Sequence, residues 1–390
     1  MTSTVVVPLG DLAKITGGGT PTRTSAEFYG GPIPWVTPKD MKCWEIYGSL
    51  VSITERGLAS STTRMVPTNS VLLVVRSGVL KHTLPVALNR RPVAINQDMK
   101  ALECRADTSP DFLAHFIKAQ SPHILEWVRG TTADNFPIDK LKALLVTLPP
   151  LPEQRRIAEV LDRADTLRAK RRAALAQLDT LTQSIFFDMF GDPATILGRW
   201  STSKLGGLLS FLTSGSRGWA AHYADAGDLF LRIQNVRRDE LVLDDVAFVN
   251  PPPTAEAKRT RVRAGDVLLS ITADLGRTAV VPEGIGTAFI NQHLSILRTD
   301  ALVPRFLSAF LSSPAGQRQI ASSNNVGVKS GLNFDDVRQL TIPTPPRADQ
   351  EWFVHRVEAA ERLRSSHHQS LTHLDTLFAS LQHRAFRGEL

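Results

Sequence analysis

The sequence is poor in cysteine: its 390 residues contain only two, Cys43 and Cys104, both in the first half. Neither belongs to a CxxC pair or to another metal-ligand spacing, so the sequence argues against a disulfide framework and for a reduced intracellular compartment. No run approaches the roughly 18 apolar residues of a membrane span, and residues 1–10 contain no basic stretch followed by an apolar core. We therefore expect a soluble, cytoplasmic protein with no membrane segment.

Acidic residues are also fewer than basic ones. The sequence has 38 Asp and Glu against 45 Lys and Arg, a formal net charge of +7. Excess positive charge suits a polyanionic partner, although many soluble proteins are mildly basic. With 42% hydrophobic and 21% charged residues, the chain does not have the composition of a disordered or fibrous protein, and it is long enough to bury two domain-sized cores.

The same order of short motifs occurs twice, with most pairs about 196 residues apart. The first copy comprises Leu9-Gly10, Val71-Leu72-Leu73, Ile95-Asn96-Gln97, Asn135-Phe136, Gln154 and Leu178-Asp179-Thr180-Leu181. The second comprises Leu205-Gly206, Val267-Leu268-Leu269, Ile290-Asn291-Gln292, Asn333-Phe334, Gln350 and Leu374-Asp375-Thr376-Leu377. This near-constant spacing indicates an internal duplication, and each copy is too long for a solenoid repeat. We expect two globular domains, each followed by a helix, in a pseudo-two-fold arrangement.

Each predicted domain has a mixed texture. Between Val5 and Leu148, short apolar and β-branched runs are broken by Gly, Pro and Asn, which is typical of strands joined by loops. Helical spacing is clearest in residues 110–116, where a proline at an early helical position precedes apolar residues, and residues 304–310 repeat the pattern. We therefore expect an α+β fold.

After the proline-rich segments 148–152 and 343–346 the periodicity becomes that of long helices. Apolar residues in alternating steps of three and four predict a pairing seam over about four heptads. The seam of the first helix comprises Ile157, Val160, Ala164, Leu167, Ala174, Leu178, Leu181 and Ile185. That of the second comprises Phe353, Val357, Ala360, Leu363, Leu371, Leu374, Leu377 and Leu381.

A helix of about 36 residues is roughly 54 Å long, enough to hold two domains well apart. Because each domain precedes its helix, a two-fold pairing of the helices must be antiparallel. We predict one domain over residues 1–150, a long helix over 151–191, a second domain over 192–346 and a second long helix over 347–390. The two helices would then pack as an antiparallel coiled coil.

The middle of each predicted helix is polar. Antiparallel pairing would bring the two polar stretches to one level as a basic belt, formed by Arg168, Lys170, Arg171, Arg172, Arg364, His367 and His368. One interpretation is a solvated helix face, which is what charge runs usually form. The other is a surface that lies over the phosphates of a DNA spacer.

Several motifs in a fixed order carry a family resemblance. They are Gly18-Gly19-Thr20-Pro21, the segment from Tyr29 to Trp35, Asp40, Leu151-Pro152-Glu153-Gln154 and Phe190-Gly191-Asp192-Pro193. With the duplicated domain-plus-helix plan, the chain resembles the specificity subunit of type I restriction-modification systems over essentially its full length. Two segments depart from the pattern: residues 345–350 lack the full Leu-Pro-Glu-Gln, and residues 214–219 replace Gly-Gly-Thr-Pro.

The resemblance implies a non-catalytic recognition subunit that serves phage defence and DNA methylation. Two target recognition domains would each bind one half of a bipartite, asymmetric site in double-stranded DNA. The two helices would space these domains and dock two modification (methyltransferase) subunits, while restriction (endonuclease and translocase) subunits complete the nuclease. S-adenosylmethionine, ATP and Mg would be bound by the partners, and no cofactor by this chain.

Residues common to both halves must serve one scaffold twice, so Asn96 and Asn291 are expected to satisfy backbone groups at turns or strand ends. Base-reading residues should instead be polar and differ between the halves, because a symmetric pair would read a palindrome. The candidates in the first domain are Arg23, Lys39, Arg76, Lys81, His82, Arg90 and Arg91. Those in the second domain are Arg217, Arg232, Gln234, Asn235, Arg237, Arg238, Arg277 and Lys329. Trp35 and Trp219 fit loop anchors better than base-stacking groups.

Motifs of enzymes are incomplete. Asn250-Pro251-Pro252-Pro253 lacks the aromatic residue of an adenine methyltransferase motif, and Gly17-Gly18-Gly19-Thr20 lacks the spacing and lysine of a P-loop. The sequence also has no metal-ligand cluster, so we expect no catalysis and no metal. The alternative to a DNA-reading subunit is a coiled-coil scaffold or adaptor of a related phage-defence or orphan methylation complex.

Overall fold

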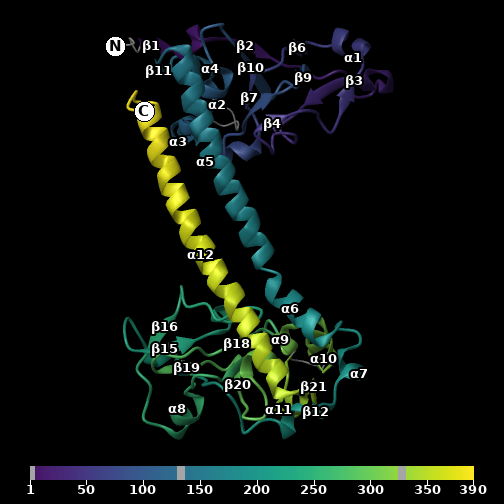
Figure 1. Ribbon diagram of the computed structural model, residues 1–390, viewed down its shortest axis with the longest axis vertical. Helices are drawn as coiled ribbons and strands as arrows, with labels where there is room; N and C mark the ends of the chain where they lie inside the picture. The colour runs from purple at the N-terminus through teal and green to yellow at the C-terminus, as the bar shows by residue number, and fades with distance from the viewer. Residues whose placement is uncertain (1–4, 130–136, 324–330) are drawn as a thin grey trace. The chain divides into compact units, whose positions relative to one another are not determined.

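The computed structural model of the protein describes residues 5–129, 137–323 and 331–390. It divides into two compact units. Unit 1 combines residues 1–172 with 369–390, and unit 2 consists of residues 173–368. Each unit contains one mixed α/β domain and a segment of each long helix (Figure 1). The boundaries fall inside the helices because the apolar face of each helix end belongs to the core of the domain beside it.

Unit 1 is built on two sheets and a strand pair. The five-stranded sheet has the order β2-β10-β7-β8-β4, with β2 Ala13–Gly17, β10 Met99–Cys104, β7 Val71–Val74, β8 Val86–Asn89 and β4 Glu45–Ile46. The four-stranded sheet has the order β5-β3-β9-β6, with β5 Ser52–Ile53, β3 Tyr29–Val36, β9 Val93–Ile95 and β6 Met65–Val66. The strand pair is β1 Val5–Pro8 with β11 Leu145–Leu148. The helices of this domain are α1 Glu55–Ala59, α2 Pro110–Ala119, α3 Ser121–Arg129 and α4 Ile138–Lys142.

Unit 2 repeats the plan. One sheet has the order β13-β20-β17-β18, with β13 Phe211–Ser214, β20 Leu294–Arg298, β17 Val267–Ser270 and β18 Thr278–Val280. The other has the order β14-β16-β15-β19, with β14 Tyr223–Ala224, β16 Ala247–Val249, β15 Asp228–Leu231 and β19 Ala288–Ile290. The strand pair is β12 Thr202–Lys204 with β21 Thr341–Pro343. The helices are α6 Leu181–Phe190, α7 Ile196–Arg199, α8 Ala255–Thr260, α9 Pro304–Ser312, α10 Pro314–Ser323 and α11 Phe334–Gln339.

The predicted duplication is confirmed in the register of the strands. The repeated Val-Leu-Leu motifs form β7 and β17, which are buried throughout and pair with β10 and β20. In unit 1, β3 runs parallel to β9, which ends at Ile95 of the first Ile-Asn-Gln motif. In unit 2, β15 runs parallel to β19, which ends at Ile290 of the second. Asn96 and Asn291 each accept a hydrogen bond of 3.2 Å from the backbone N–H two residues on. These asparagines therefore close turns, as the sequence predicts.

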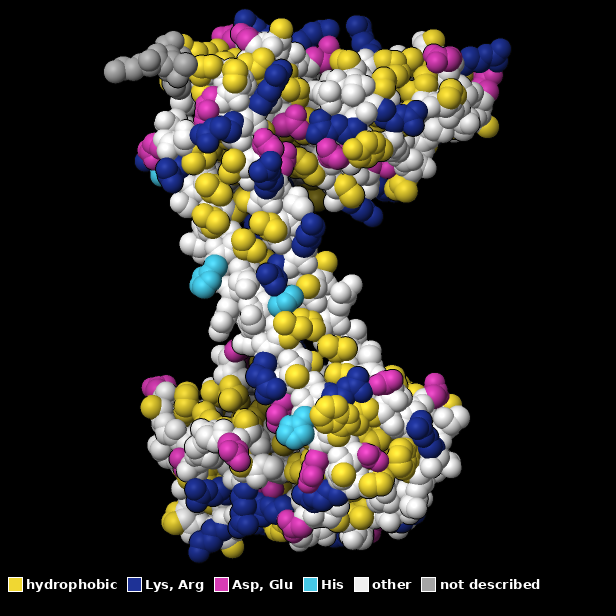
Figure 2. Space-filling view, viewed as in Figure 1, with side chains coloured by type: hydrophobic (Ala, Val, Ile, Leu, Met, Phe, Trp, Pro, Cys, Tyr) yellow, Lys and Arg dark blue, Asp and Glu magenta, His cyan; other side chains and the backbone are white. Residues whose placement is uncertain are grey.

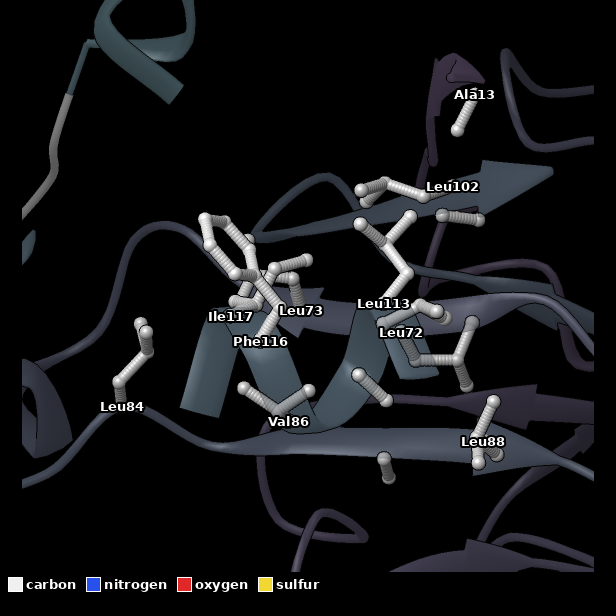
Figure 3. Packing of buried hydrophobic residues seen from close by; sticks show 14 of the residues in the cluster. Ala13, Leu72, Leu73, Leu84, Val86, Leu88, Leu102, Leu113, Phe116 and Ile117 are labelled. Carbon is white, nitrogen blue, oxygen red and sulfur yellow. The ribbon is translucent and has the colours of Figure 1, made fainter. Parts of the chain in front are cut away.

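Helix α2 illustrates how the core forms. Ser109 caps its N-terminus by accepting a hydrogen bond from the Phe112 N–H, and Pro110 occupies the first turn. Figure 3 shows Leu113 and Phe116 on this helix lying over the sheet residue Leu73. All three are buried, and burial of each such side chain contributes about 1.5–3 kcal/mol.

A buried glutamine fixes each long helix to its domain. Helix α5 spans Leu151–Leu178 and α12 spans Arg347–Ala385. The Gln154 amide accepts a hydrogen bond from the Ser109 N–H (2.8 Å) and donates to the carbonyls of Pro149 (2.8 Å) and Asp107 (3.0 Å). Gln350 repeats this arrangement: it accepts from the Val303 N–H and donates to the Pro345 carbonyl. The second helix therefore starts like the first despite its lack of Leu-Pro-Glu.

The predicted continuous helix over residues 151–191 is interrupted. Helix α5 ends at Leu178, and α6 begins at Leu181. The Thr180 hydroxyl donates to the Gln177 carbonyl, and the Ser184 hydroxyl donates to the Thr180 carbonyl. Such bonds compete with the backbone ladder and bend helices. At the duplicated position Thr376 makes only the bond to the carbonyl four residues before it, and α12 continues.

The helix segments within each unit run antiparallel, as predicted. In unit 2, Asp179 lies 4.0 Å from Arg364, and nine residues later Asp188 lies 2.8 Å from Arg356. In unit 1, Arg168 forms an ion pair of 2.6 Å with Asp375. The end of α12 also contributes to the unit 1 core, where the Phe386 ring packs against α2.

The predicted seam is wrong at three positions. Leu167, Leu363 and Leu377 are 54%, 48% and 52% exposed. The residues that follow them take the inward places: Arg168 stacks on Phe378 at 4.2 Å, and Arg364 pairs with acidic residues. The apolar pattern misplaced the seam because charged side chains occupy it. The other predicted pairing residues, Ile157, Leu178, Leu181, Ile185, Phe353, Leu374 and Leu381, are buried or partly buried.

We expect Gln154→Ala to lower the free energy of unfolding by about 2 kcal/mol, because it leaves the Ser109 N–H and two carbonyls buried without a partner. Urea unfolding of the purified chain measures the change. Gln177→Ala is the matched control, since Gln177 is exposed on the same helix, and it should change stability by less than about 0.5 kcal/mol. Equal stability of the two variants would contradict the role assigned to Gln154.

Candidate nucleic-acid interface

Two loops of unit 2 meet at one edge of the sheets. The first follows β15 and comprises residues 232–246, and the second joins β17 to β18. They are hydrogen-bonded to each other: the Thr278 N–H donates to the Arg237 carbonyl (3.2 Å), and the Arg277 guanidinium donates to the Val236 carbonyl (3.3 Å). We call them the reading loops of unit 2.

The reading loops surround a cavity of about 310 Å³. Three arginines, Arg237, Arg238 and Arg277, line it together with Asp274, Leu275, Gly276 and Gln317. Asp274 holds Arg277 in an ion pair. Arg237 and Arg238 are exposed, and their side chains have no hydrogen-bond or ion-pair partner among the residues that the structure describes. An arginine that is exposed and unpaired can bind a phosphate or the edge of guanine.

The backbone of these loops is strained. Asp239 and Ala273 adopt φ angles of 60° and 62°, and both belong to the three non-glycine residues with positive φ in the described chain. This conformation is costly for residues with a side chain and persists where the surroundings impose it. Here α9 imposes it, because Ser308 donates a hydrogen bond to the Asp239 carboxylate and Arg305 donates to the Asp239 carbonyl.

Asp239 is a buried acid at the base of the first loop. Burial raises its pKa to about 6, against the opposing effects of Arg305 and of the hydrogen bond from Ser308. Its Oδ2 atom accepts no hydrogen bond and lies 3.7 Å from the Arg305 guanidinium. Arg305 in turn binds Glu361 on α12 at 2.6 Å. The loop is thus connected to the long helix through one charged residue of α9.

Unit 1 has the corresponding loops, residues 37–44 after β3 and residues 75–85 after β7. Asp40 shapes the first by accepting hydrogen bonds from Thr37 and from the Leu50 N–H. At its end the Trp44 ring stacks on His115 of α2 at 4.6 Å, and His115 contacts Asp162 of α5 at 2.7 Å. Each unit therefore links a reading loop to a long helix through the helix that covers its sheet.

Comparison with known proteins connects this architecture to a family. Residues 2–177 match the model of the type I restriction modification DNA specificity domain. Residues 2–177 therefore belong to the type I restriction modification DNA specificity domain family. The chain is 39% identical to the EcoR124I/EcoR124II specificity subunit of Escherichia coli over 162 residues, which is 41% of this chain and 40% of that protein. It is 25% identical to the EcoBI specificity subunit of Escherichia coli over 335 residues, 77% of this chain and 70% of that one.

Solved structures show the same fold. A chain from a study of the assembly and conformational transition of a type I R-M system aligns over 100% of both chains with a TM-score of 0.64 and 19% identity. The S subunit from M. genitalium aligns over 99% of this chain and 96% of its own, with a TM-score of 0.58 and 15% identity. The shared fold is the pair of α/β domains with long helices.

The structure places the predicted DNA-contacting residues in different surroundings. Seven are exposed and have no side-chain partner among the described residues: Arg23, Lys39, His82, Arg91, Arg217, Arg237 and Arg238. Lys81 is exposed as well. Four pair with acids: Arg76 with Asp98, Arg232 and Gln234 with Asp245, and Arg277 with Asp274. Lys329 lies outside the described residues. Arg237, Arg238 and Arg277 line one cavity together.

Two predicted readers are scaffold residues instead. Asn235 is 2% exposed, and its amide donates to the carbonyls of Val242 and Asp245 while accepting from the Arg232 N–H. Arg90 is partly buried and binds Glu45 at 2.8 Å and Asp111 at 2.6 Å. Each of the two residues differs from its counterpart in the other unit because the two units satisfy their local polar groups with different hydrogen bonds and ion pairs. Asymmetry alone therefore does not identify a base-reading residue.

The two tryptophans are buried, as the sequence predicts for loop anchors. Trp35 is 5% exposed and donates its indole N–H to the Gly19 carbonyl at 3.0 Å, while Trp219 is 4% exposed among Phe230 and Phe289.

The basic belt predicted on the long helices is partly neutralised. The Arg168 side chain is 17% exposed between Asp165 and Asp375, and Arg172 also binds Asp375. Arg364 binds Glu240 at 3.0 Å. Lys170 remains exposed, and Arg171 is partly exposed. Arg168 thus holds the helices together, while Lys170 keeps the exposure that a DNA contact needs.

Sequence reasoning missed one basic cluster, residues 258–263 at and after α8. Its signal was present as cations at Lys258, Arg259, Arg261 and Arg263, with Val262 between the last two. Across the described residues, no group of three or more His, Cys, Asp or Glu is arranged to hold a metal ion, and no helix has the length and apolarity to cross a membrane.

Asp239 should make stability depend on pH. Because its folded pKa of about 6 is above its usual 3.8, the folded state binds the proton more tightly than the unfolded state. The free energy of unfolding should therefore fall as pH rises from about 4 to about 6, by up to about 3 kcal/mol. Urea unfolding of Asp239→Asn over pH 4–7 should lack this decrease.

The exposed Asp300 provides the control, because Asp300→Asn should keep the wild-type pH profile. A difference between wild type and Asp239→Asn that stays constant with pH would contradict a raised pKa at Asp239.

Proposed function

We propose that the chain is the sequence-specific DNA-binding specificity subunit of a type I restriction-modification complex. It reads a bipartite, asymmetric site in double-stranded DNA, with one half-site for each domain. The observation that carries this proposal is a scaffold present twice with different reading loops. The strands, turn asparagines and buried glutamines coincide in both units, whereas the loops after β3 and β15 and after β7 and β17 differ in length and charge.

The geometry of the loops supports direct reading of bases. In unit 2 the exposed Arg237 and Arg238 project from a loop that α9 holds in a strained conformation. Fixed guanidinium groups recognise guanine through two hydrogen bonds, at about 1–3 kcal/mol of discrimination. In unit 1 the corresponding loops present Lys39, Lys81 and His82. Unlike side chains on like scaffolds favour two unlike half-sites.

The long helices are the proposed docking surface for two methyltransferase subunits, with restriction subunits joining them. Each helix is tied to a domain by its buried glutamine and by the charged link through α2 or α9. A partner on the helices would thereby be oriented relative to the bound half-site. We assign S-adenosylmethionine, ATP and Mg to these partners, so this chain supplies recognition and no catalysis.

Methylation mapping tests the proposal. The purified chain with S-adenosylmethionine and DNA should transfer no methyl groups. Co-expressed with a methyltransferase subunit of a type I restriction-modification system from the same organism, the chain should yield methylated sites in a two-part, non-palindromic motif with a fixed gap. A palindromic motif, or methylation by the partner alone at the same sites, would contradict the proposal. Methyl transfer by the lone chain would contradict the non-catalytic assignment.

Substitutions in the unit 2 loop should affect one half-site only. We expect Arg237→Ala with Arg238→Ala to relax base preference in one half of the motif by about 1–3 kcal/mol for each lost bidentate contact. The preference in the other half should stay as in the wild type. Binding competition with duplexes that carry single base changes measures both halves. Lys39→Ala with Lys81→Ala is the reciprocal variant, and equal relaxation of both halves would contradict separate reading.

A further inference from the structure

A second basic site in unit 2 lies away from the reading loops. The α8 ridge consists of Lys258, Arg259, Arg261 and Arg263. Figure 2 shows Lys and Arg side chains gathered over α8, at the lower edge of unit 2 in that view. The ridge forms one wall of a cavity of about 830 Å³, and Arg298 on β20 also lines it. Five cations line this cavity, and no carboxylate does among the described residues.

Local structure places these cations on one surface. Lys258 and Arg259 end helix α8, and the chain then continues as an extended segment in which Arg261 bridges Phe289 of β19. Val262 is 4% exposed and packs into the core of unit 2. Because side chains alternate along an extended segment, burial of Val262 turns Arg261 and Arg263 outward together.

The ridge is held in place and only partly neutralised. Arg298 is engaged by Asp266 in two hydrogen bonds of 2.7 Å, and Arg259 lies 3.7 Å from Glu256 and donates to the Ser214 carbonyl at 2.7 Å. The side chains of Lys258 and Arg263 have no hydrogen-bond or ion-pair partner among the described residues. Like charges held close together repel one another, and a bound anion removes that cost.

The opposite wall admits a bulky ligand. The loop of residues 282–286 supplies Pro282, Gly284, Ile285 and Gly286 to the cavity. Both glycines have positive φ, and a Cβ placed on either would meet no atom within 4 Å. The cavity is therefore open above these glycines, next to the cations.

The scaffold does not require this charge. Strand register matches Arg261 to Met65 of unit 1, because both pair with the second residue of the equivalent strand, β19 or β9. Arg298 likewise matches Glu103, which follows Leu102 as Arg298 follows Leu297. Unit 1 thus has an apolar residue and an acid where unit 2 has two arginines. The duplicated fold therefore forms without cations at these two positions.

We infer that the α8 ridge binds phosphates of the DNA backbone outside the bases read by the unit 2 loops. This inference rests on the proposed function. It assigns to the ridge a part of the DNA-binding affinity that does not depend on the base sequence. Phosphate is the ligand because clustered Arg and Lys side chains on an open surface match its charge and its oxygen acceptors.

The salt dependence of binding tests the inference, with the chain in complex with its methyltransferase partner. Each phosphate contact contributes about 0.9 to the slope of log affinity against log salt. Arg261→Gln with Arg263→Gln should lower the slope by about 1.8 and weaken binding at 50 mM salt by on the order of tenfold per lost contact. The loss should be the same for specific and unrelated duplexes.

The matched control removes the same net charge from unit 1. Lys14→Gln with Arg56→Gln alters two exposed side chains, one of them on α1, the counterpart of α8. This variant should keep the wild-type slope. Thermal unfolding of both variants should match the wild type, which separates lost contacts from lost folding.

Shortening the duplex locates the contact. Trimming flanking base pairs beyond the half-site read by unit 2 should weaken wild-type binding to the level of the Arg261→Gln, Arg263→Gln variant, which trimming should leave unchanged. Trimming beyond the other half-site should leave the difference between wild type and variant intact. A variant with the slope of the control overturns the inference. The inference is also overturned if calorimetry detects ATP binding to the wild type but not to the variant, while both have the same salt slope for DNA binding. That result would assign the ridge to free nucleotides.

The outcome for the proposed function is separate. If the wild-type complex binds no specific duplex and methylates no two-part motif, the proposed function fails. If it does both and the ridge variant behaves as the control, only the role of the ridge fails.

Discussion

The arrangement of each unit depends on one buried amide. Gln154 and Gln350 are 1% and 2% exposed, and each fills a gap where a proline turn leaves backbone groups without partners. An amide in such a place is costly unless its bonds are made, and its bonds are made only when the helix leaves the domain in one direction. The start of each long helix is therefore oriented by the domain before it. In the proposed complex, a partner bound to the helix would in turn be oriented by DNA bound to the loops.

The two units perform this task with different chemistry on one scaffold. In unit 1 a contact between the rings of Trp44 and His115 continues to Asp162, whereas in unit 2 Asp239 continues through Arg305 to Glu361. Both routes join a reading loop to a long helix across the helix that covers the sheet. Duplication kept the backbone path and allowed the side chains along it to change, at the cost of one buried polar atom without a hydrogen bond on each route, the Trp44 Nε1 and the Asp239 Oδ2 atoms. Loops freed from a common sequence could then diverge toward different half-sites.

The duplication, the antiparallel helices and the turn role of Asn96 and Asn291 could be predicted, because repeated spacing and strand chemistry are local properties of the sequence. The register of the seam could not be predicted, because Arg168 and Arg364 face inward and pair with acids from distant segments. A search for apolar periodicity leaves such charged positions out of the seam. The separation of readers from scaffold failed at Arg90 for the same reason, because its partner Glu45 is 45 residues away in the chain. It failed at Asn235 although the partners of that amide lie within 10 residues, because its burial appears only in the folded structure.

Pairing decides which arginines can contribute to recognition. An arginine such as Arg76, bound to Asp98 at 2.6 Å, must release a carboxylate before it binds a base, and the released acid then repels the phosphates nearby. Arg237 and Arg238 give up only water, so their full interaction with DNA adds to affinity. A paired arginine gains in selectivity instead, because only a base that replaces both hydrogen bonds compensates for the lost acid. In unit 2 the unpaired Arg237 and Arg238 and the paired Arg277 line the same cavity. Under the proposed function, this arrangement would place affinity and discrimination at one set of bases.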